Sequence, residues 1–365
     1  MKILVFGLTI SSSWGNGHAT PYRAILRALA RMGHEVHFFE KDVEYYRSRR
    51  DFDRCDYCHL TIYDDWSSIR RQAMEEARSC DVVMTASYLP EGRRINDEML
   101  ELDGPLRVYY DLDTPITLRR LEAGAVEYVD RNQIAAFDLV LSFVGGPALA
   151  ELEKRHGAGM ARALYGCVDP DEYRRVEPTG DFACDLSYMA TFAPDRQKKM
   201  DALFLEPARR HPQKRFMLAG SMYPWNWPWP ENVRRAEHVP PQSHPRFYSS
   251  SRITLNLTRA EMAHNGWCPS GRFFEAAACG TPVISDWWEG LDWFFDVVHD
   301  IRVVACPEHV ENALNMPDPE LRALAAHARE RTLDDHTGQV RAGQLLQYLE
   351  EARAASAHLK SESAR

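Results

Sequence analysis

Short apolar runs alternate with amphipathic stretches along most of this chain, a pattern typical of a parallel sheet wrapped by helices. In the first half, strands are expected at residues 2–8, 35–40, 82–87, 106–110 and 139–143, and helices at 22–31, 67–78 and 147–155. In the first helix, Ile25, Leu26 and Leu29 fall on one face, and Gly33 ends it before the next strand. The first half therefore predicts a doubly wound α/β domain.

The second half repeats this alternation after a break. Between residues 169 and 184 the periodicity gives way to Asp, Pro and Gly, which indicates an inter-domain connection. Strands are then expected at 186–192, 215–219, 253–257, 283–285 and 301–305, and helices at 195–210, 319–330 and 339–354. We place the domains at 1–170 and 171–354, followed by a flexible tail at 355–365. The last helix is a candidate to cross back to the first domain.

Composition narrows the class of protein. The chain has 365 residues, 45% of them hydrophobic and 27% charged, which suits two folded domains. Its net charge of −9 argues against a broad nucleic-acid surface. No run approaches the roughly 20 apolar residues of a membrane span, and the apolar start fits a first strand better than a signal peptide. We therefore expect a cytoplasmic protein whose eight scattered cysteines are reduced thiols.

One cysteine pattern requires a separate judgement. Cys55-Asp56-Tyr57-Cys58-His59 matches the attachment sequence for c-type haem. That chemistry needs an oxidising compartment and an axial ligand, and a zinc site would need a second ligand pair at suitable spacing. We therefore reject both interpretations and expect no metal site.

Residues 269–286 are the most informative stretch. Ser270 is a good N-cap, and Gly271 lets backbone approach a ligand closely at the start of a helix. Free N–H groups and partial positive charge at a helix start favour a diphosphate, to which Arg272 can add a hydrogen bond. Glu275, one turn on, can accept hydrogen bonds from both ribose hydroxyls. The alternative is a plain helix–turn–strand unit with a surface Arg272–Glu275 pair, and spacing alone does not decide.

The loop at residues 11–21 joins the first expected strand to the first helix. Its segment Trp14-Gly15-Asn16-Gly17 allows close approach of a ligand but lacks the three-glycine fingerprint of dinucleotide-binding enzymes. His18 is a candidate general base because imidazole titrates near working pH; holding the loop is the alternative role. Asp113 is a candidate acceptor contact or base. The alternative is an ordinary turn at the end of a strand, in which Asp111 and Thr114 form hydrogen bonds with backbone groups.

The ordered motifs carry a family resemblance. Residues 274–285, Phe-Glu-Ala-Ala-Ala-Cys-Gly-Thr-Pro-Val-Ile-Ser, resemble the donor-binding motif of GT-B glycosyltransferases related to glycogen and sucrose synthases. More closely, the chain resembles CgeB-like, spore-maturation type GT-B glycosyltransferases. The matching pieces are Trp14-Gly15-Asn16-Gly17, Gly33-His34-Glu35-Val36, Asp111-Leu112-Asp113-Thr114-Pro115, Asp195-Arg196-Gln197, Tyr223-Pro224, Trp229-Pro230, Leu255-Asn256-Leu257-Thr258-Arg259, the donor motif, His336-Thr337 and Arg341-Ala342.

The resemblance implies two Rossmann-like domains facing each other across a cleft. It also implies a nucleotide sugar as co-substrate, with a UDP-sugar favoured, and no cofactor. In such enzymes the helix start and basic side chains stabilise the leaving diphosphate, so Asp111 and Asp113 are not expected to hold a metal. The donor-binding candidates are Arg196, Lys199, Tyr223, Arg259, Ser270, Gly271, Arg272, Glu275 and Glu289; the catalytic candidates are His18 and Asp113; and the acceptor-side loop is Trp14, Gly15, Asn16 and Gly17.

Other positions in this set also have alternatives. Trp267 stands where the broader group often has a sugar-contacting glutamate, eight positions before Glu275, and Glu289 is a candidate substitute. Arg196, like Lys199, also fits an ordinary N-capped basic helix. Tyr223 begins the aromatic tract 223–230, which fits either a sugar-stacking surface or a packed loop.

The expected function is hexosyltransferase-like transfer of a sugar from a nucleotide diphosphate to a hydroxyl of a small molecule or glycan. Trp267 keeps open a second interpretation, a non-catalytic protein that binds sugar nucleotides or glycans. A dinucleotide-dependent oxidoreductase has a similar outline, but the missing glycine fingerprint argues against it.

Overall fold

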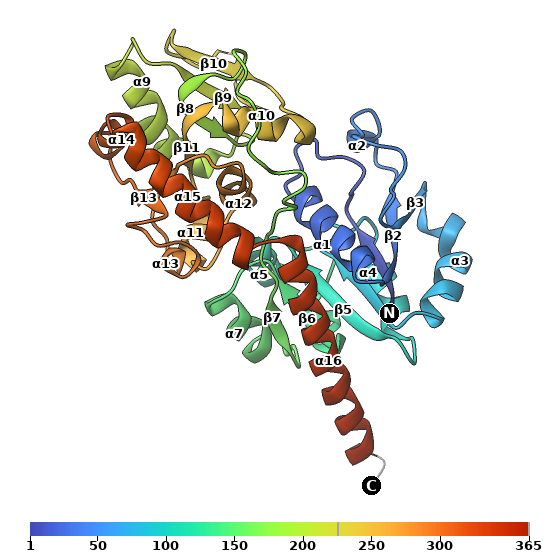
Figure 1. Ribbon diagram of the computed structural model, residues 1–365. Helices are drawn as coiled ribbons and strands as arrows, with labels where there is room; N and C mark the ends of the chain where they lie inside the picture. Colours follow the sequence, from blue (N-terminus) through green and yellow to red (C-terminus); the bar gives the residue numbers. More distant parts are fainter. Residues whose placement is uncertain (225, 364–365) are drawn as a thin grey trace. The chain divides into compact units, whose positions relative to one another are not determined.

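The computed structural model describes residues 1–224 and 226–363, which form two compact units (Figure 1). Unit 1 is Met1–Tyr165 with Gly338–Arg365, and unit 2 is Gly166–Thr337. The chain thus enters unit 2 five residues before the expected boundary, because Val168 already pairs with Thr337 in unit 2. The expected tail is mostly helical, since α16 (Gly338–Ser363) runs through it; residues 364–365 lie outside the described part.

Unit 1 is built on a seven-stranded parallel sheet with the order β3-β2-β1-β4-β5-β6-β7. Its strands are β1 (Lys2–Gly7), β2 (Glu35–Lys41), β3 (His59–Tyr63), β4 (Val82–Ala86), β5 (Leu106–Asp111), β6 (Leu139–Ser142) and β7 (Ala161–Ala163). Its helices are α1 (Ala19–Arg31), α2 (Glu44–Arg47), α3 (Trp66–Arg78), α4 (Gly92–Leu100), α5 (Thr114–Glu122), α6 (Arg131–Ala136), α7 (Pro147–Lys154) and α16.

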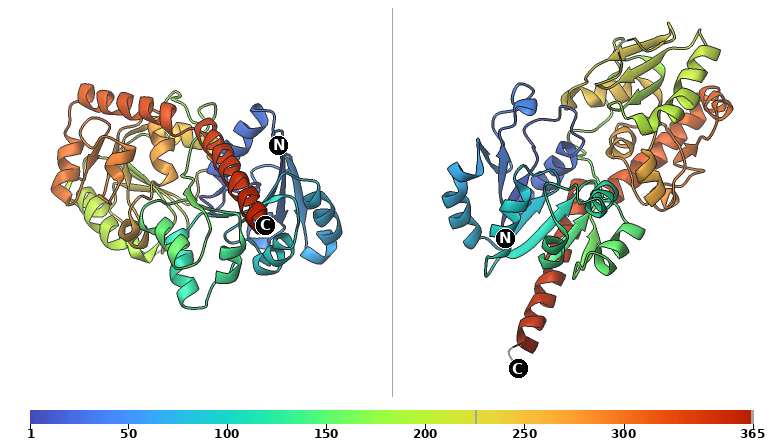
Figure 2. Two further views of the ribbon diagram at one scale, coloured as in Figure 1. Left: turned by 90° about the horizontal axis from the view of Figure 1, so that it is seen from below. Right: turned by 180° about the vertical axis from the view of Figure 1, so that it is seen from behind.

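Side chains alternate between the two faces of this sheet. Leu4 and Phe6 of β1 join a core cluster with residues of α3 and α4, so Ile3 and Val5 point to the other face. There α1 packs against β2 and α16, and α16 also reaches β5 and β6. Figure 2 shows the last turns of α16 extending past the other elements of unit 1. Helices thus cover both faces, as in doubly wound folds.

Unit 2 repeats the plan with a six-stranded parallel sheet of order β10-β9-β8-β11-β12-β13. Its strands are β8 (Cys184–Met189), β9 (Phe216–Ala219), β10 (Val233–Ala236), β11 (Ser251–Asn256), β12 (Val283–Ser285) and β13 (Ile301–Val303). Its helical segments are η1 (Pro194–Arg196), α8 (Gln197–Met200), η2 (Asp201–Leu205), α9 (Glu206–Arg210), η3 (Pro241–Ser243), α10 (His244–Ser249), α11 (Ala260–Asn265), α12 (Gly271–Ala278), α13 (Leu291–Phe294), α14 (Pro307–Leu314) and α15 (Asp318–Asp335).

The strand order places a topological switch point in each sheet. In unit 2 the chain builds β8, β9 and β10 in one direction, and β11 then returns to pair with β8 on its other side. In unit 1, β4 pairs with β1 in the same way. Ligands of such sheets bind beyond the carboxyl ends of the strands at this point. The strands that flank these points end at Met189 and Asn256 in unit 2 and, for β1 of unit 1, at Gly7.

Candidate functional site

The start of α12 lies at the switch point of unit 2. Arg272 in its first turn donates from Nη1 to the Met189 carbonyl at the end of β8, at 2.6 Å. Its Nε donates to Ser270 Oγ, at 2.9 Å. Ser270 holds the N-cap position as expected, but its side chain makes no capping hydrogen bond. The Ser270 hydroxyl orients Arg272 instead, so the N–H groups in the first turn of α12 receive no capping hydrogen bond from Ser270.

Packing within the protein does not require a glycine at position 271, the first residue of α12. A Cβ built there meets only Glu275 Oε1, at 3.9 Å, and the backbone is not in the left-handed region. The protein itself therefore has room for a side chain at this position. A ligand lying directly against the backbone N–H groups would account for the missing side chain.

A second arginine lies beside Arg272. Arg196 at the end of η1 is 7% exposed and donates from Nη2 to the Thr191 carbonyl, while its buried Nε has no partner in the described structure. Burial lowers the pKa of Arg196, and the charges of Arg272 and Arg259 lower it further. Three guanidinium groups thus share one region. An anion of more than one charge would relieve this repulsion.

One carboxylate partly balances these arginines. Arg259 Nε lies 3.4 Å from Asp195 Oδ2, which also accepts from the N–H of Ala260 at 3.0 Å. This contact fixes the beginning of α11 against η1. It leaves the cluster of Arg196, Arg259 and Arg272 with net positive charge near the end of β8.

Glu275 is buried one turn behind Arg272. It is 6% exposed, its Oε2 accepts from the Tyr248 hydroxyl at 3.3 Å, and His244 Nδ1 lies 3.6 Å from the same oxygen. Glu275 therefore does not form the surface ion pair with Arg272 that was the alternative from the sequence. His244 is itself held by hydrogen bonds at both ring nitrogens, from Tyr173 and to the Val239 carbonyl. The carboxylate is fixed in place.

Lys199 on α8 has a partner within the protein. Its Nζ binds Asp286 Oδ2, and Asp286 Oδ1 accepts from the Thr258 N–H at 2.9 Å. The pair joins α8 to the loop after β12 and the loop after β11. This contact explains Lys199 without a ligand, although its side chain remains 35% exposed.

Trp267 and Glu289 meet through the backbone. Trp267, in the left-handed region at φ 48°, donates its N–H to the Glu289 carbonyl at 2.7 Å, and its ring packs over Gly290. The Glu289 side chain is exposed. The loop thus presents the Trp267 indole where a glutamate is often found in the resembled group. The ring centroids of Trp267 and Trp293 are 6.1 Å apart.

The aromatic tract is in large part a packed loop. Tyr223, Trp227 and Trp229 pack against the core of unit 2, and Tyr223 also makes an edge contact with Phe192. Burial raises the pKa of Tyr223, while the charges of Arg196 and Arg272 act to lower it. Tyr223 thus adjoins the arginine cluster. Trp225 lies outside the described residues.

In unit 1 the loop before α1 is held by buried side chains. Glu40 at the end of β2 accepts from the N–H groups of Ile10 and Ser11, at 2.8 and 3.0 Å. Asn16 donates to the Ser12 carbonyl at 3.2 Å and accepts from the N–H of His18 at 2.9 Å. These contacts give the loop a fixed conformation.

The other loop candidates differ in how much room they have. Gly15 has φ 59°, and a Cβ there would meet the Tyr45 hydroxyl at 2.7 Å, so packing explains this glycine. Gly17 has nothing within 4 Å of a built Cβ. The ring of Trp14 lies under the guanidinium of Arg49, 3.8 Å from its centroid. Gly17 is thus the open position of the loop.

His18 and Asp113 come together beyond the ends of β1 and β5. His18 Nε2 lies 3.9 Å from Asp113 Oδ2, and His18 Nδ1 is buried without a partner in the described structure. Burial lowers the pKa of His18, and Asp113 partly offsets this effect. Tyr88, in the left-handed region at φ 62°, lies 5.8 Å from the imidazole between ring centroids. The uncharged imidazole is thus favoured near neutral pH.

Asp111 serves the turn that precedes α5. Its Oδ1 accepts from the Asp113 N–H and the Thr117 hydroxyl, both at 3.0 Å, and the Thr114 hydroxyl donates to its carbonyl. The turn interpretation therefore holds for Asp111 and Thr114. Among the described residues, no cluster of three or more His, Cys, Asp or Glu side chains could hold a metal ion.

Tyr88, His244 and Tyr248 were not found from the sequence, whereas Asp195 and Asp286 lay in stretches that it singled out without a role of their own. Tyr248 and His244 lie on α10, far from the donor motif along the chain, and no local pattern marks them. Asp286 ends the motif, and only the contact with Lys199 shows its role.

Residues 196–347 match a family model described as glycosyl transferase-like. No curated protein matches the chain. Three solved structures are similar over nearly the whole chain. Sucrose-phosphate synthase from Thermosynechococcus elongatus has a TM-score of 0.67 at 14% identity and covers 97% of this chain and 100% of its own. An alpha-glucosyltransferase in complex with UDP-glucose and DNA has a TM-score of 0.71 at 12% identity, and the match covers 96% of this chain and 99% of that protein. HepE from Anabaena, in complex with UDP and glucose, has a TM-score of 0.65 at 12% identity, and the match covers 96% of this chain and 100% of that protein.

These likenesses establish the GT-B fold, with two Rossmann-like units on parallel sheets of seven and six strands. The fold expected from the sequence is thus confirmed, whereas the CgeB-like subtype stays a prediction. Within residues 1–224 and 226–363, no helix is long and apolar enough to cross a membrane.

Proposed function

We propose that this protein transfers a sugar from a UDP-sugar to a hydroxyl acceptor without a metal. The match of residues 196–347 to a glycosyl transferase-like family supports sugar transfer, and the UDP-bound neighbours support the nucleotide. The observation that carries the proposal is the arginine cluster at the switch point of unit 2, with buried Glu275 one turn behind Arg272.

In this proposal the diphosphate lies against the start of α12. Arg272, Arg196 and the N–H groups beside Gly271 stabilise the negative charge that develops as the nucleotide leaves. Glu275 accepts hydrogen bonds from the ribose hydroxyls, since Tyr248 occupies only one of its oxygens. Ser270 positions Arg272, and Arg259 and Tyr223 border the same region.

On the acceptor side, we assign His18 as the group that takes a proton from the hydroxyl. Burial lowers the pKa of His18 and so favours its uncharged form near neutral pH, and Asp113 at 3.9 Å favours the imidazolium that forms. Trp14 to Gly17 form the loop beside it, and the acceptor is a small molecule or glycan. One neighbour binds DNA, but the net charge of −9 disfavours a polyanionic acceptor here.

The Glu275→Gln variant tests the donor site. Loss of a charged hydrogen bond of about 1.5–3 kcal/mol raises the Kd for UDP roughly 10- to 100-fold, because a neutral amide accepts more weakly. Isothermal titration calorimetry measures this Kd, with Glu320→Gln, an exposed residue of α15, as the matched control. An unchanged Kd in the Glu275 variant would exclude this carboxylate from the donor site.

Trp267 supports a second candidate, a protein that binds UDP-sugars without transferring them. Its indole replaces a carboxylate on the sugar side. A panel of UDP-sugars, with and without EDTA, separates the two: release of UDP supports the transferase, and EDTA-resistant release supports metal independence. Tight binding with no release would favour the binding protein.

A further inference from the structure

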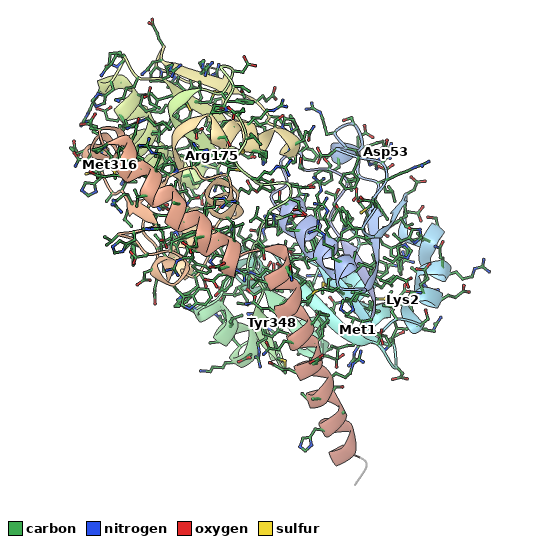
Figure 3. All side chains as sticks on the ribbon, in the orientation of Figure 1. Met1, Lys2, Asp53, Arg175, Met316 and Tyr348 are labelled. Atoms are coloured by element: carbon green, nitrogen blue, oxygen red, sulfur yellow. The ribbon has the colours of Figure 1, made fainter. Side chains whose placement is uncertain are left out.

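Two cysteines of unit 1 lie in contact near the surface. Cys55 Sγ and Cys58 Sγ are 3.0 Å apart, and both residues are half-buried, between exposed Arg54, Asp56 and His59. They belong to the connection between α2 and β3, whose position is shown by Asp53, labelled in Figure 3. Neither takes part in the proposed sugar transfer.

The connection is anchored at two points, one before the cysteine pair and one between the two cysteines. Asp51 accepts from Arg23 Nη2 at 2.7 Å and from the Ser13 N–H at 2.8 Å. Tyr57 lies under the guanidinium of Arg27, at 4.6 Å from its ring centroid. A disulfide has an S–S length of about 2.05 Å, so closing the bond requires a shift of only about 1 Å between these sulfurs.

The two thiols are chemically unequal. Cys55 Sγ and Cys58 Sγ share a hydrogen bond, and the Cys55 sulfur also accepts hydrogen bonds from the backbone N–H groups of Tyr57 and Cys58; these contacts lower the pKa of Cys55 despite its burial. The same hydrogen bond, together with burial, raises the pKa of Cys58. A thiolate beside a protonated thiol is the arrangement of a nucleophile and its resolving partner.

We propose that Cys55 and Cys58 form a redox-active dithiol, which a small-molecule disulfide oxidises to an intramolecular disulfide that stiffens segment 51–58. The Cys55 thiolate attacks one sulfur of glutathione disulfide and displaces a glutathione thiolate. Cys58 then loses its proton, attacks the Cys55 sulfur and displaces the second glutathione. The protein dithiol gives up two electrons, and one glutathione disulfide becomes two glutathione molecules.

The experiment treats the reduced full-length protein with glutathione disulfide and maps its peptides by mass spectrometry. In the wild type, the peptide carrying both cysteines loses two hydrogen atoms and keeps no glutathione. In Cys58→Ser, glutathione stays attached to Cys55, because no thiol resolves the mixed disulfide. In Cys55→Ser, Cys58 reacts at least about tenfold more slowly, because it lacks thiolate character.

Cys306→Ser is the matched control, since Cys306 is the other half-buried cysteine in the described structure. It leaves the Cys55–Cys58 reaction unchanged. A stable glutathione adduct in the wild type, or equal reaction rates of Cys55→Ser and Cys58→Ser, would overturn the dithiol. Hydrogen exchange in 51–58 slows on oxidation; unchanged exchange there would overturn the stiffening.

Discussion

Asp111 shows how burial changes a single carboxyl group. It is fully buried, its Oδ2 has no partner in the described structure, and the hydroxyls of Tyr22 and Tyr109 are buried without partners as well. Burial raises the pKa of Asp111 to about 7, although hydrogen bonds from Asp113 and Thr117 oppose the shift. The folded protein therefore holds this proton more tightly than the unfolded chain, in which an Asp titrates near pH ~3.9.

Asp111 predicts a loss of stability as pH rises. Between about pH 4 and 7 the folded state binds more protons than the unfolded state, so the free energy of unfolding falls, by up to about 4 kcal/mol from this group. Asp111→Asn, which stays uncharged, removes most of that dependence. Urea unfolding of unit 1, followed by hydrogen exchange of β5 at pH 5 and pH 8, measures it, with exposed Asp103→Asn as control. An equal pH dependence in Asp111→Asn and the wild type would contradict the prediction.

At the residue scale, the sequence predicted the placement of residues within one helix better than contacts between residues far apart in the chain. Arg272 and Glu275 were placed near one another by helix spacing, and both lie at the switch point. Contacts such as Lys199 with Asp286 or Glu275 with Tyr248 join residues far apart in the chain. Only the fold brings them together, so no local pattern reveals them.

At the scale of elements, the carboxyl ends of β8 and β9 are closely packed. A Cβ on Gly220, just after β9, would lie 1.8 Å from the Ala190 carbonyl oxygen, just after β8. Arg272 binds the adjacent Met189 carbonyl. The backbone beneath the proposed donor site thus depends on one glycine, whereas a Cβ on Gly271 at the start of α12 would meet only Glu275 Oε1, at 3.9 Å.

These two glycines predict opposite outcomes. Gly220→Ala clashes with backbone, so it lowers stability by about 1–3 kcal/mol and weakens UDP binding as β8 shifts. Gly271→Ala leaves the melting temperature unchanged but weakens UDP binding, because its methyl group occupies the place that we propose for the diphosphate. Calorimetric melting and titration with UDP measure both effects. Wild-type UDP affinity in Gly271→Ala would place the diphosphate elsewhere, and wild-type melting of Gly220→Ala would contradict the packing.

Two long elements, α1 and α3, were predicted to within three residues, whereas α15 ends five residues and α16 nine residues beyond the expected bounds. Shorter ones were missed, among them β3 and β7. β3 is an edge strand with one buried residue, so it carries little hydrophobic alternation, and β7 has only three residues. The expected helix 195–210 is interrupted by η2, before Pro207, which has no N–H to continue the regular hydrogen bonds.

At the scale of the whole molecule, α16 returns the chain to unit 1. Its residues Ala342, Leu345, Leu349 and Ala352 are buried, and Gly338 fits closely against Ala24 of α1. Arg341, 1% exposed, donates to the Tyr165 carbonyl at 3.2 Å. Unit 1 is therefore assembled from two separate stretches of sequence, and unit 2 from one.

This arrangement predicts that damage to α16 affects one unit. Leu349→Ala removes a buried side chain and lowers the stability of unit 1 by about 2–5 kcal/mol, while UDP binding by unit 2 is unaffected. Hydrogen exchange of both units in urea and UDP titration measure the two effects, with exposed Glu350→Ala as control. Equal destabilisation of both units would show that they unfold together.

The same arrangement has a consequence for biosynthesis. A ribosome completes every residue of unit 2 before it makes α16, so unit 2 can close while unit 1 still lacks a helix. At about 5–20 residues per second, the N-terminal stretch waits roughly 10–40 s with the surface of α1 uncovered. During that interval the face of α1 that α16 later covers is exposed to solvent.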